Sequence, residues 1–338
     1  MTMSVSVSKV SAPLPWQAEI WLRLNQQLAG GQLPHALLLT GPEYTGKSRL
    51  ALALARLLLC ARPVGGLNCG ECHPCELSAS GNHGDFQWLE PEGKGRVVKI
   101  EQIRKLVEFA GRTAGFGLRK VVVIAPAENM NISAANALLK VLEEPPANTH
   151  LLLVSHRPHG LPATIRSRCQ ILRPALPDRQ ASLAWLGPLC GSREQAERML
   201  DLAGLRPLLA AQLHAEASGE RLEATRLAMR AVFTGRAATS ALAAALAGDD
   251  LQSALAQLAG GIESLLRSLD GPALASRQAR GGFALLDDIV RIQRAIRAGS
   301  NPNPQLLLDG VLANMQRVLG DGGLGDKIGA NPGASIHE

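Results

Sequence analysis

Two groups of residues in this 338-residue chain have the types and spacing that chemistry requires. The first is GPEYTGKS, residues 41–48, which satisfies the phosphate-binding pattern G-x-x-x-x-G-K-[ST] between an apolar run and a helical segment. Gly41 and Gly46 would let the backbone wrap a phosphate. Lys47 would neutralise its charge, and Ser48 could ligate a metal ion. The alternative is a helix start and turn without a ligand.

Four cysteines form the second group, with the spacing C-x8-C-x2-C-x2-C. Two overlapping C-x2-C steps let a turn place thiolates around one tetrahedral ion. Disulfides are the alternative, but a cytosolic chain keeps its thiols reduced, which favours zinc. The predicted ligands are Cys60, Cys69, Cys72 and Cys75. Because four protein ligands complete the coordination, the zinc is predicted to be structural, and the nearby His73 and His83 are expected at the surface.

The chain lacks the acidic residues that accompany a phosphate-binding loop in proteins that hydrolyse nucleotides. Such proteins hold Mg²⁺ through an acidic residue at the tip of a neighbouring strand, often beside a second carboxylate that polarises water. Here that strand, KVVVI, is followed by Ala125 and Pro126, and we expect the side chain of Glu128 to point elsewhere. Loss of a general base alone lowers a rate by about 10² to 10⁴. We therefore expect binding of a nucleotide or phosphate at most, with turnover near background.

Short apolar runs alternate with helical segments through the first half of the chain. Strands are predicted at residues 35–41, 85–91, 120–125, 150–155 and 170–177, with helices at 48–60, 100–112 and 133–144. This alternation predicts a parallel sheet that is covered on both faces. From Pro177 to about residue 320 the spacing is helical, with breaks at GSRE, ASGE, AGDD, LDGP and GSNPNP. The Gly-rich residues 321–338 are predicted to be a disordered tail.

Composition narrows the class of protein. Apolar residues make up 46% of the chain, which is enough for a large core in two or three domains. No apolar run has the roughly 18 residues of a membrane-spanning helix, and residues 1–15 lack the apolar core of a secretion signal, so a cytosolic protein is expected. The formal net charge is +6, and the basic excess lies in residues 1–177. That excess suits a phosphate-rich partner or simply a soluble surface.

These features together resemble the clamp-loader subunits of bacterial replicative DNA polymerase III, which are members of the AAA+ class. The matching stretches are the cysteine insert, SAANALLKVLEEPP at residues 133–146 and LPATIRSRCQI at residues 161–171. The resemblance covers about residues 16–177 and continues as helical composition. It implies an α/β AAA+ (P-loop) parallel-sheet domain followed by all-helical lid and collar domains. The implied domains are residues 1–177, with a zinc module at 60–75, then the lid at 178–214 and the collar at 215–320.

Within this family, motor subunits keep an Asp-Glu pair at the strand tip, whereas the fixed, delta-prime type has lost it. The Ala125-Pro126 pair, the segment SGNHGDF at residues 80–86 and the context APAENMNISAANALLK resemble the delta-prime type. The phosphate-binding loop is intact here, although that type often has a damaged one. The resemblance therefore implies a subunit without ATPase activity of its own, and it leaves binding of ATP or ADP open.

The resemblance also implies a role for Arg168, in the sequence Ser167-Arg168-Cys169. It matches the family's arginine finger, which reaches across a subunit interface toward the neighbour's γ-phosphate. Spacing alone favours a surface arginine in a local ion pair. His156 matches a phosphate-sensing position, although a solvated loop histidine is the favoured interpretation. Arg206 lies near a second sensing position in the lid, but the pattern around it fits poorly.

The implied partners are the delta subunit and the gamma/tau motor subunits, in a hetero-oligomeric ring. The sliding clamp and primed DNA would be reached through that complex, in the cytoplasm at the nucleoid-associated replisome. Two other classes of protein remain open. An active AAA+ ATPase of the motor type would hydrolyse ATP alone and lose this activity on Lys47→Ala. A zinc-dependent DNA-binding module would bind DNA through residues 1–177 with strong salt dependence.

Overall fold

The computed structural model describes residues 9–92, 97–116, 119–216, 219–233, 236–247, 249–267, 269, 271–297, 300 and 302–319. The tail predicted at residues 321–338 lies outside the described residues. Contacts divide the chain into two compact units, Met1–His214 and Ala215–Glu338. Among the described residues, no helix is both long enough and apolar enough to cross a membrane.

A five-stranded parallel sheet forms the centre of the first unit, with the strand order β2-β3-β4-β1-β5. The strands are β1 (Ala36–Thr40), β2 (Phe86–Leu89), β3 (Lys120–Ile124), β4 (Thr149–Ser155) and β5 (Gln170–Leu172). All five predicted strands are therefore present. β5 ends earlier than predicted because Pro174 and Pro177 have no N–H to donate to a neighbouring strand.

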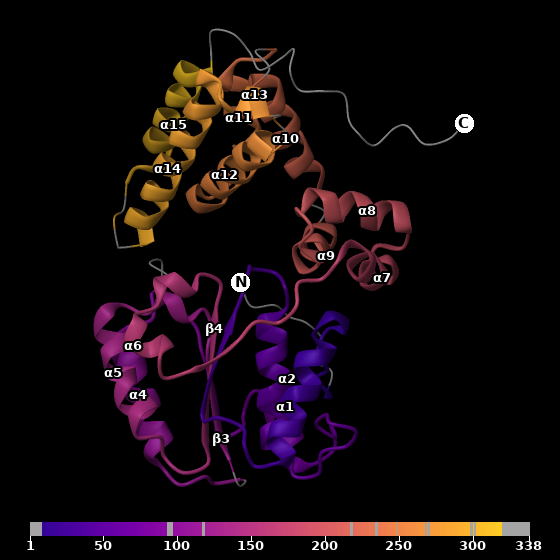
Figure 1. Cartoon of the computed structure of the whole chain (residues 1–338), viewed down its shortest axis with the longest axis vertical. Coiled ribbons are helices and arrows are strands. Elements are labelled where there is room, and N and C mark those ends of the chain that lie inside the picture. The colour runs from indigo at the N-terminus through magenta and orange to yellow at the C-terminus, as the bar shows by residue number, and fades with distance from the viewer. Residues whose placement is uncertain are drawn as a thin grey trace. The chain divides into compact units, whose positions relative to one another are not determined.

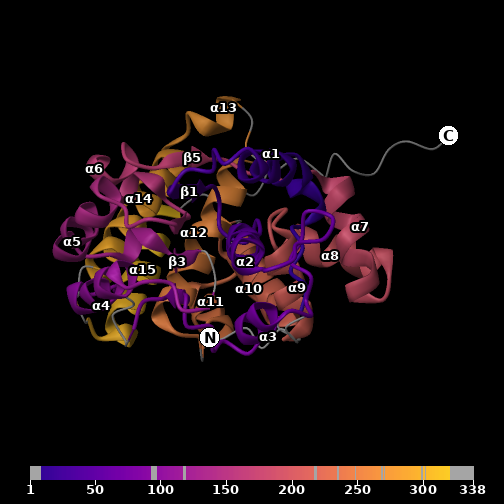
Figure 2. The same ribbon diagram turned by 90° about the horizontal axis from the view of Figure 1, so that it is seen from below.

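Both faces of the sheet are buried, as the alternation of strands and helices predicts. Successive strand residues point to opposite faces, so Leu37 and Leu39 pack on one face and Leu38 on the other. The first face is covered by α1 (Ala18–Ala29) and α2 (Lys47–Leu59). The second is covered by α4 (Ile100–Gly111) and α5 (Ile132–Glu143), with α6 (Ala163–Arg166) beside them. Both layers are visible in Figure 1 and again in Figure 2.

The described residues that follow β5 form helices and connecting segments. In the first unit, α7 (Arg179–Cys190), α8 (Arg193–Leu202) and α9 (Pro207–Ala215) share a small core of their own. The second unit contains α10 (Gly219–Phe233), α11 (Thr239–Ala245), α12 (Leu251–Arg267), α13 (Gly271–Leu274), α14 (Arg277–Arg297) and α15 (Pro304–Leu319). Its core is built largely from leucine, isoleucine and alanine. The architecture confirms the predicted fold class, an α/β AAA+ domain with a parallel sheet followed by helical segments.

Candidate functional site

The phosphate-binding loop connects β1 to α2 and depends on glycine. Gly46 has a φ of +93° and is the N-cap of α2, which begins at Lys47. A Cβ atom on Gly46 would lie 2.2 Å from Leu14 Cδ1, so both its backbone angle and its surroundings require glycine. The loop therefore has the sharp turn into a helix N-terminus that phosphate-binding loops use.

Lys47 is almost fully buried, with 2% of its surface exposed. Its Nζ donates to the carbonyl oxygen of Pro42 within the same loop. Burial lowers the pKa of Lys47 to about 8, against the opposing effect of Glu128 and then Glu43. A phosphate group bound at Lys47 would further favour the charged form of this lysine.

Glu128 lies at the carboxyl ends of the strands, which form the end of the sheet where the phosphate-binding loop (residues 41–48, the P-loop) follows β1. Thr40 at the end of β1 pairs with Ser155 at the end of β4, so His156 follows β4 beside the loop. Glu128, in the 3-10 helix η2 (Ala127–Asn129), accepts a hydrogen bond from the His156 backbone N–H at 3.0 Å. The expectation that Glu128 points elsewhere is wrong, because its carboxylate satisfies this backbone donor at the end of β4.

The Glu128 carboxylate is enclosed and only partly satisfied. Its side chain is 2% exposed, and Arg157 Nε lies 3.8 Å from Oε1. Oε2 is buried and has no hydrogen-bond partner among the residues that the structure describes, and the same is true of His156 Nδ1. Burial and the nearby Lys47 lower the pKa of His156. His156 is half-buried and its Nδ1 is buried, so the expectation of a solvated loop histidine is wrong.

An N-terminal segment packs against the P-loop from the other side. Trp16 Nε1 and Gln17 Nε2 both donate to the Thr45 carbonyl oxygen, at 3.0 and 3.4 Å. The Trp16 ring meets the Trp185 ring of α7 edge-on, with centroids 5.9 Å apart. Sequence reasoning missed these residues, because nothing in their spacing shows that they reach a loop almost thirty residues away.

Arg206 also faces the loop. Its guanidinium lies 6.0 Å from the centre of the Tyr44 ring, and its Nε donates to the Ala203 carbonyl oxygen at 2.9 Å. A cation over an aromatic ring at this distance is a weak attraction. The structure thus brings Arg206 to the side of the P-loop formed by Tyr44, within the first unit.

The four cysteines of the predicted module come together, with all of their Sγ atoms within 4.8 Å of one another. The pairs Cys60–Cys72 and Cys69–Cys75 have Sγ atoms 3.9 Å apart. Zn–S bonds of about 2.3 Å in a tetrahedron separate the sulfurs by about 3.8 Å. The donor set therefore fits a tetrahedral metal ion with four thiolate ligands.

Polar groups around the cysteines also suit thiolates. The backbone N–H of Cys69 points at Cys60 Sγ at 3.3 Å, and the backbone N–H groups of Glu71 and Cys72 lower the pKa of Cys69 to about 6. Burial raises the pKa of Cys60 to about 12. A bound cation would hold the buried Cys60 as a thiolate, which burial alone opposes.

Asn68 joins the cysteine module to the N-terminal segment. It is 1% exposed, and its Nδ2 donates to Cys75 Sγ at 3.5 Å and to the Lys9 carbonyl oxygen at 2.7 Å. Its Oδ1 accepts from the backbone N–H of Ser11 at 2.8 Å. Sequence reasoning missed Asn68, although a polar residue directly before a ligand cysteine could have drawn attention.

The two histidines near the cysteines differ. His73 is exposed, as expected. His83 is 4% exposed, so the expectation of a surface residue is wrong. Its Nδ1 accepts from the backbone N–H of Asp85 at 3.0 Å, and its ring packs 5.8 Å from the Phe116 ring, which covers it.

Arg168 lies after α6 at the surface of the first unit. Its Nη2 is 2.6 Å from Glu143 Oε1, and its Nη1 donates to the Thr164 carbonyl oxygen at 3.1 Å. The side chains of Arg168 and Glu143 are 36% and 50% exposed. The local ion pair that spacing alone favours is thus present in the isolated chain, and the guanidinium is accessible from outside.

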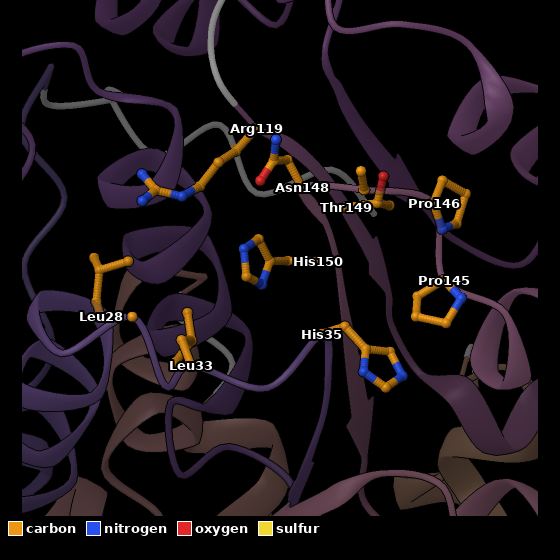
Figure 3. Close-up of a pocket in the computed structure, with 11 residues that line it drawn as sticks. Leu28, Leu33, His35, Arg119, Pro145, Pro146, Asn148, Thr149 and His150 are labelled. Atoms are coloured by element: carbon orange, nitrogen blue, oxygen red, sulfur yellow. The ribbon is translucent and has the colours of Figure 1, made fainter.

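A pocket of about 370 Å³ opens at the opposite edge of the sheet (Figure 3). Its lining includes His35 before β1, Arg119 before β3 and His150 in β4, and Figure 3 shows these three side chains around it. The P-loop follows the carboxyl end of β1, so this pocket is separate from the candidate phosphate site.

Comparison with known proteins gives one family and several relatives. The model of a family described as "DNA polymerase III, delta subunit" matches residues 16–176. A Pseudomonas aeruginosa protein named "DNA polymerase III subunit delta'" is 46% identical over 209 residues, which cover 61% of this chain and 63% of that protein. A Yersinia pestis protein of the same name is 37% identical over 294 residues, which cover 85% of this chain and 84% of that protein.

A solved structure from Thermotoga maritima, a DNA polymerase III gamma subunit-related protein, is also similar. It is 20% identical with a TM-score of 0.48, and the match covers 89% of this chain and 99% of that one.

Proposed function

This chain belongs to the delta-prime subunit family of bacterial DNA polymerase III, and from that premise we propose that it is a clamp-loader subunit without ATPase activity of its own. It would join the delta subunit and the gamma/tau motor subunits in a hetero-oligomeric ring. That complex would open the sliding clamp and place it on primed DNA. The proposed place of work is the cytoplasm, at the nucleoid-associated replisome.

One observation carries the proposal that this subunit does not hydrolyse ATP. The P-loop is complete, yet β3 ends at Ile124 and is followed by Ala125 and Pro126 where a hydrolysing protein has carboxylates. Neither residue can anchor Mg²⁺ or accept a proton from water. We therefore propose that Gly41, Gly46, Lys47 and Ser48 bind a nucleotide or phosphate without turnover.

Arg168 is the proposed contribution of this chain to a neighbour's reaction. An arginine supplied in trans accelerates phosphoryl transfer by about 10³ to 10⁵, or roughly 4 to 7 kcal/mol. To reach a neighbouring phosphate, Arg168 must leave Glu143, and an exposed ion pair of this kind contributes about 1 kcal/mol or less. The gain therefore outweighs the loss, so the ion pair in the isolated chain is compatible with a finger in the ring.

The cysteine module is proposed to hold a structural zinc ion, for which Cys60, Cys69, Cys72 and Cys75 provide a full set of ligands. Such an ion supplies folding energy and no chemistry. The division into an AAA+ domain at residues 1–177, a lid at 178–214 and a collar at 215–320 is likewise proposed. The collar would join the subunits of the ring.

An active ATPase of the motor type is the second candidate, and the buried Glu128 near Lys47 is the observation that favours it. Glu128 lies beyond the strand tip and already accepts a backbone hydrogen bond, so it is not poised to activate water. This is why we place it second.

Two measurements on purified proteins test the proposal. The chain alone should hydrolyse ATP at background rate, and Lys47→Ala should leave that rate unchanged. Clamp loading by the delta and motor subunits on primed DNA should require this chain. ATP hydrolysis by the chain alone that disappears in Lys47→Ala would establish the motor-type alternative, and clamp loading that needs no such chain would refute the assigned role.

A further inference from the structure

The edge of the sheet beside the P-loop holds two buried polar atoms that the protein itself does not satisfy. Glu128 Oε2 and His156 Nδ1 are buried without a hydrogen-bond partner in the described part of the chain, and they follow the ends of two different strands, β3 and β4. Most buried polar atoms in native proteins have a partner, and an unpartnered carboxylate oxygen is costly to bury. Six other buried polar atoms among the described residues also have no partner, but Glu128 Oε2 is the one carboxylate oxygen in this set, so it points to a missing ligand.

The position of Glu128 tells where that ligand would sit. Its Oε1 is fixed by the backbone N–H of His156, directly after β4, and β4 pairs with β1 up to the start of the P-loop. Lys47 is enclosed at the same edge. In parallel sheets, ligands bind beyond the carboxyl ends of the strands, and Glu128 and Lys47 both lie at that end of this sheet.

The charges select the kind of ligand. Glu128 and Glu43 both act on Lys47, so a free polyphosphate would add negative charge beside two carboxylates. Arg157 offsets part of this charge from 3.8 Å, but its side chain is 47% exposed to solvent. A divalent cation bound to the polyphosphate would neutralise the excess, and carboxylate oxygen is a preferred ligand of Mg²⁺.

We propose that Glu128 Oε2 is a protein ligand, directly or through a water molecule, of a divalent cation that accompanies a nucleoside polyphosphate on the P-loop. This inference rests on the proposed nucleotide binding at Lys47. Glu128 makes the loop selective for the cation complex of the nucleotide over the free nucleotide. Hydrolysis does not follow, because Ala125 and Pro126 provide no second carboxylate to polarise water.

A binding experiment on the purified full-length chain tests this role. A fluorescent ATP analogue is titrated with and without Mg²⁺, by leaving the metal out and adding no chelator, since a chelator would also strip the cysteine module. We expect binding at least tenfold tighter with Mg²⁺. In Glu128→Gln this gain should disappear, while metal-free binding stays equal or tightens, because the amide keeps an oxygen for the His156 N–H.

Two further variants separate the possible failures. Glu108→Gln is the matched control, since Glu108 is an exposed glutamate on α4, away from the P-loop, and it should keep the Mg²⁺ effect. Lys47→Ala should lose binding in both conditions. An undiminished Mg²⁺ effect in Glu128→Gln, with binding still dependent on Lys47, overturns this inference and leaves nucleotide binding intact. No binding by the wild-type chain in either condition overturns both.

Discussion

The cysteine module and the P-loop edge differ in how completely the chain builds them. The module draws four ligands from one short segment, residues 60–75, and their sulfurs already lie at metal-site separations. The P-loop edge combines groups from the ends of β1, β3 and β4, and it keeps two buried atoms without a partner. The cysteine module provides a full set of metal ligands by itself. The P-loop edge has the glycines and the lysine that bind phosphate, but β3 is not followed by the carboxylates that catalyse hydrolysis.

The two sites therefore contribute to different properties of the molecule, the cysteine module to stability and the P-loop edge to the proposed assembly. A site that is closed by four protein ligands has no position for a substrate, so its contribution is to stability. A site that binds phosphate but cannot activate water acts, in the proposed account, through its place in a larger assembly. Arg168 on the surface then matters more for catalysis than any residue around Lys47.

The largest effect is expected when a ligand of the cysteine module is replaced. Cys75→Ser should lower metal content from one zinc per chain to well below one, because a hydroxyl is a poor substitute for a thiolate. Structural zinc sites contribute on the order of 10 kcal/mol of binding free energy in small domains, so we expect a loss of at least ~2 kcal/mol in unfolding free energy. Metal analysis and denaturant unfolding measure both.

Cys169→Ser is the matched control, since Cys169 lies outside the module. It should keep one zinc per chain whatever its effect on stability. Full zinc content in Cys75→Ser would contradict the assignment of the module.

A smaller effect is expected at the P-loop edge when pH changes. Lys47 has a pKa of about 8 in the folded chain, so it loses its proton above that pH. A phosphate group needs the charged ammonium, and affinity for a nucleotide should fall by up to about tenfold per pH unit above pH 8. Lys47→Arg stays charged and should flatten this dependence in titrations at pH 7, 8 and 9.

The lowered pKa of Lys47 affects the stability of the fold in the opposite direction, because stability rises with pH where nucleotide affinity falls. Between about pH 8 and the ordinary lysine value of 10.5, the unfolded chain holds a proton that folded Lys47 has released. The contribution of Lys47 to unfolding free energy therefore rises with pH across this window. A nucleotide affinity that is constant from pH 7 to pH 9 would contradict the burial of Lys47.

The smallest effect is expected for Glu143→Gln, which removes the ion pair of Arg168. The pair is half-exposed, so unfolding free energy should change by less than about 1 kcal/mol. In the assembled ring, Arg168 would be released from a competing carboxylate, and ATPase activity should stay equal or rise slightly. A strong fall in ring ATPase, without loss of assembly, would show that Glu143 is needed to orient Arg168.

Local patterns in the sequence predict the fold and the cysteine module well. Apolar runs such as KVVVI identify buried strands, because both faces of a parallel sheet are covered. The cysteine spacing predicts the cluster of four thiols, because the cysteines come from the end of α2, the loop that follows it and a short helix, α3 (His73–Ala79). The breaks between helices follow from glycine, as at Gly191, which ends α7 with a φ of +77°.

Long-range packing decides what the sequence does not predict. The direction of the Glu128 side chain depends on an unpaired N–H at the end of β4, and the burial of His83 depends on Phe116, thirty-three residues further along the chain. Trp16 and Gln17 reach Thr45 only because α1 packs beside α2 on the same face of the sheet. None of these contacts has a spacing signature.

The ATPase activity of a ring that contains Arg168→Ala tests whether this chain supplies an arginine finger to a neighbouring motor subunit. The variant is reconstituted with the delta and motor subunits, and DNA-stimulated ATP hydrolysis is measured beside assembly by size-exclusion chromatography. Arg173→Ala, an exposed arginine close in sequence, is the matched control. We predict a large fall in ATP hydrolysis for the Arg168→Ala ring with assembly intact, and no change for the Arg173→Ala ring. Unchanged hydrolysis in the Arg168→Ala ring would contradict the account and leave Arg168 as the surface partner of Glu143.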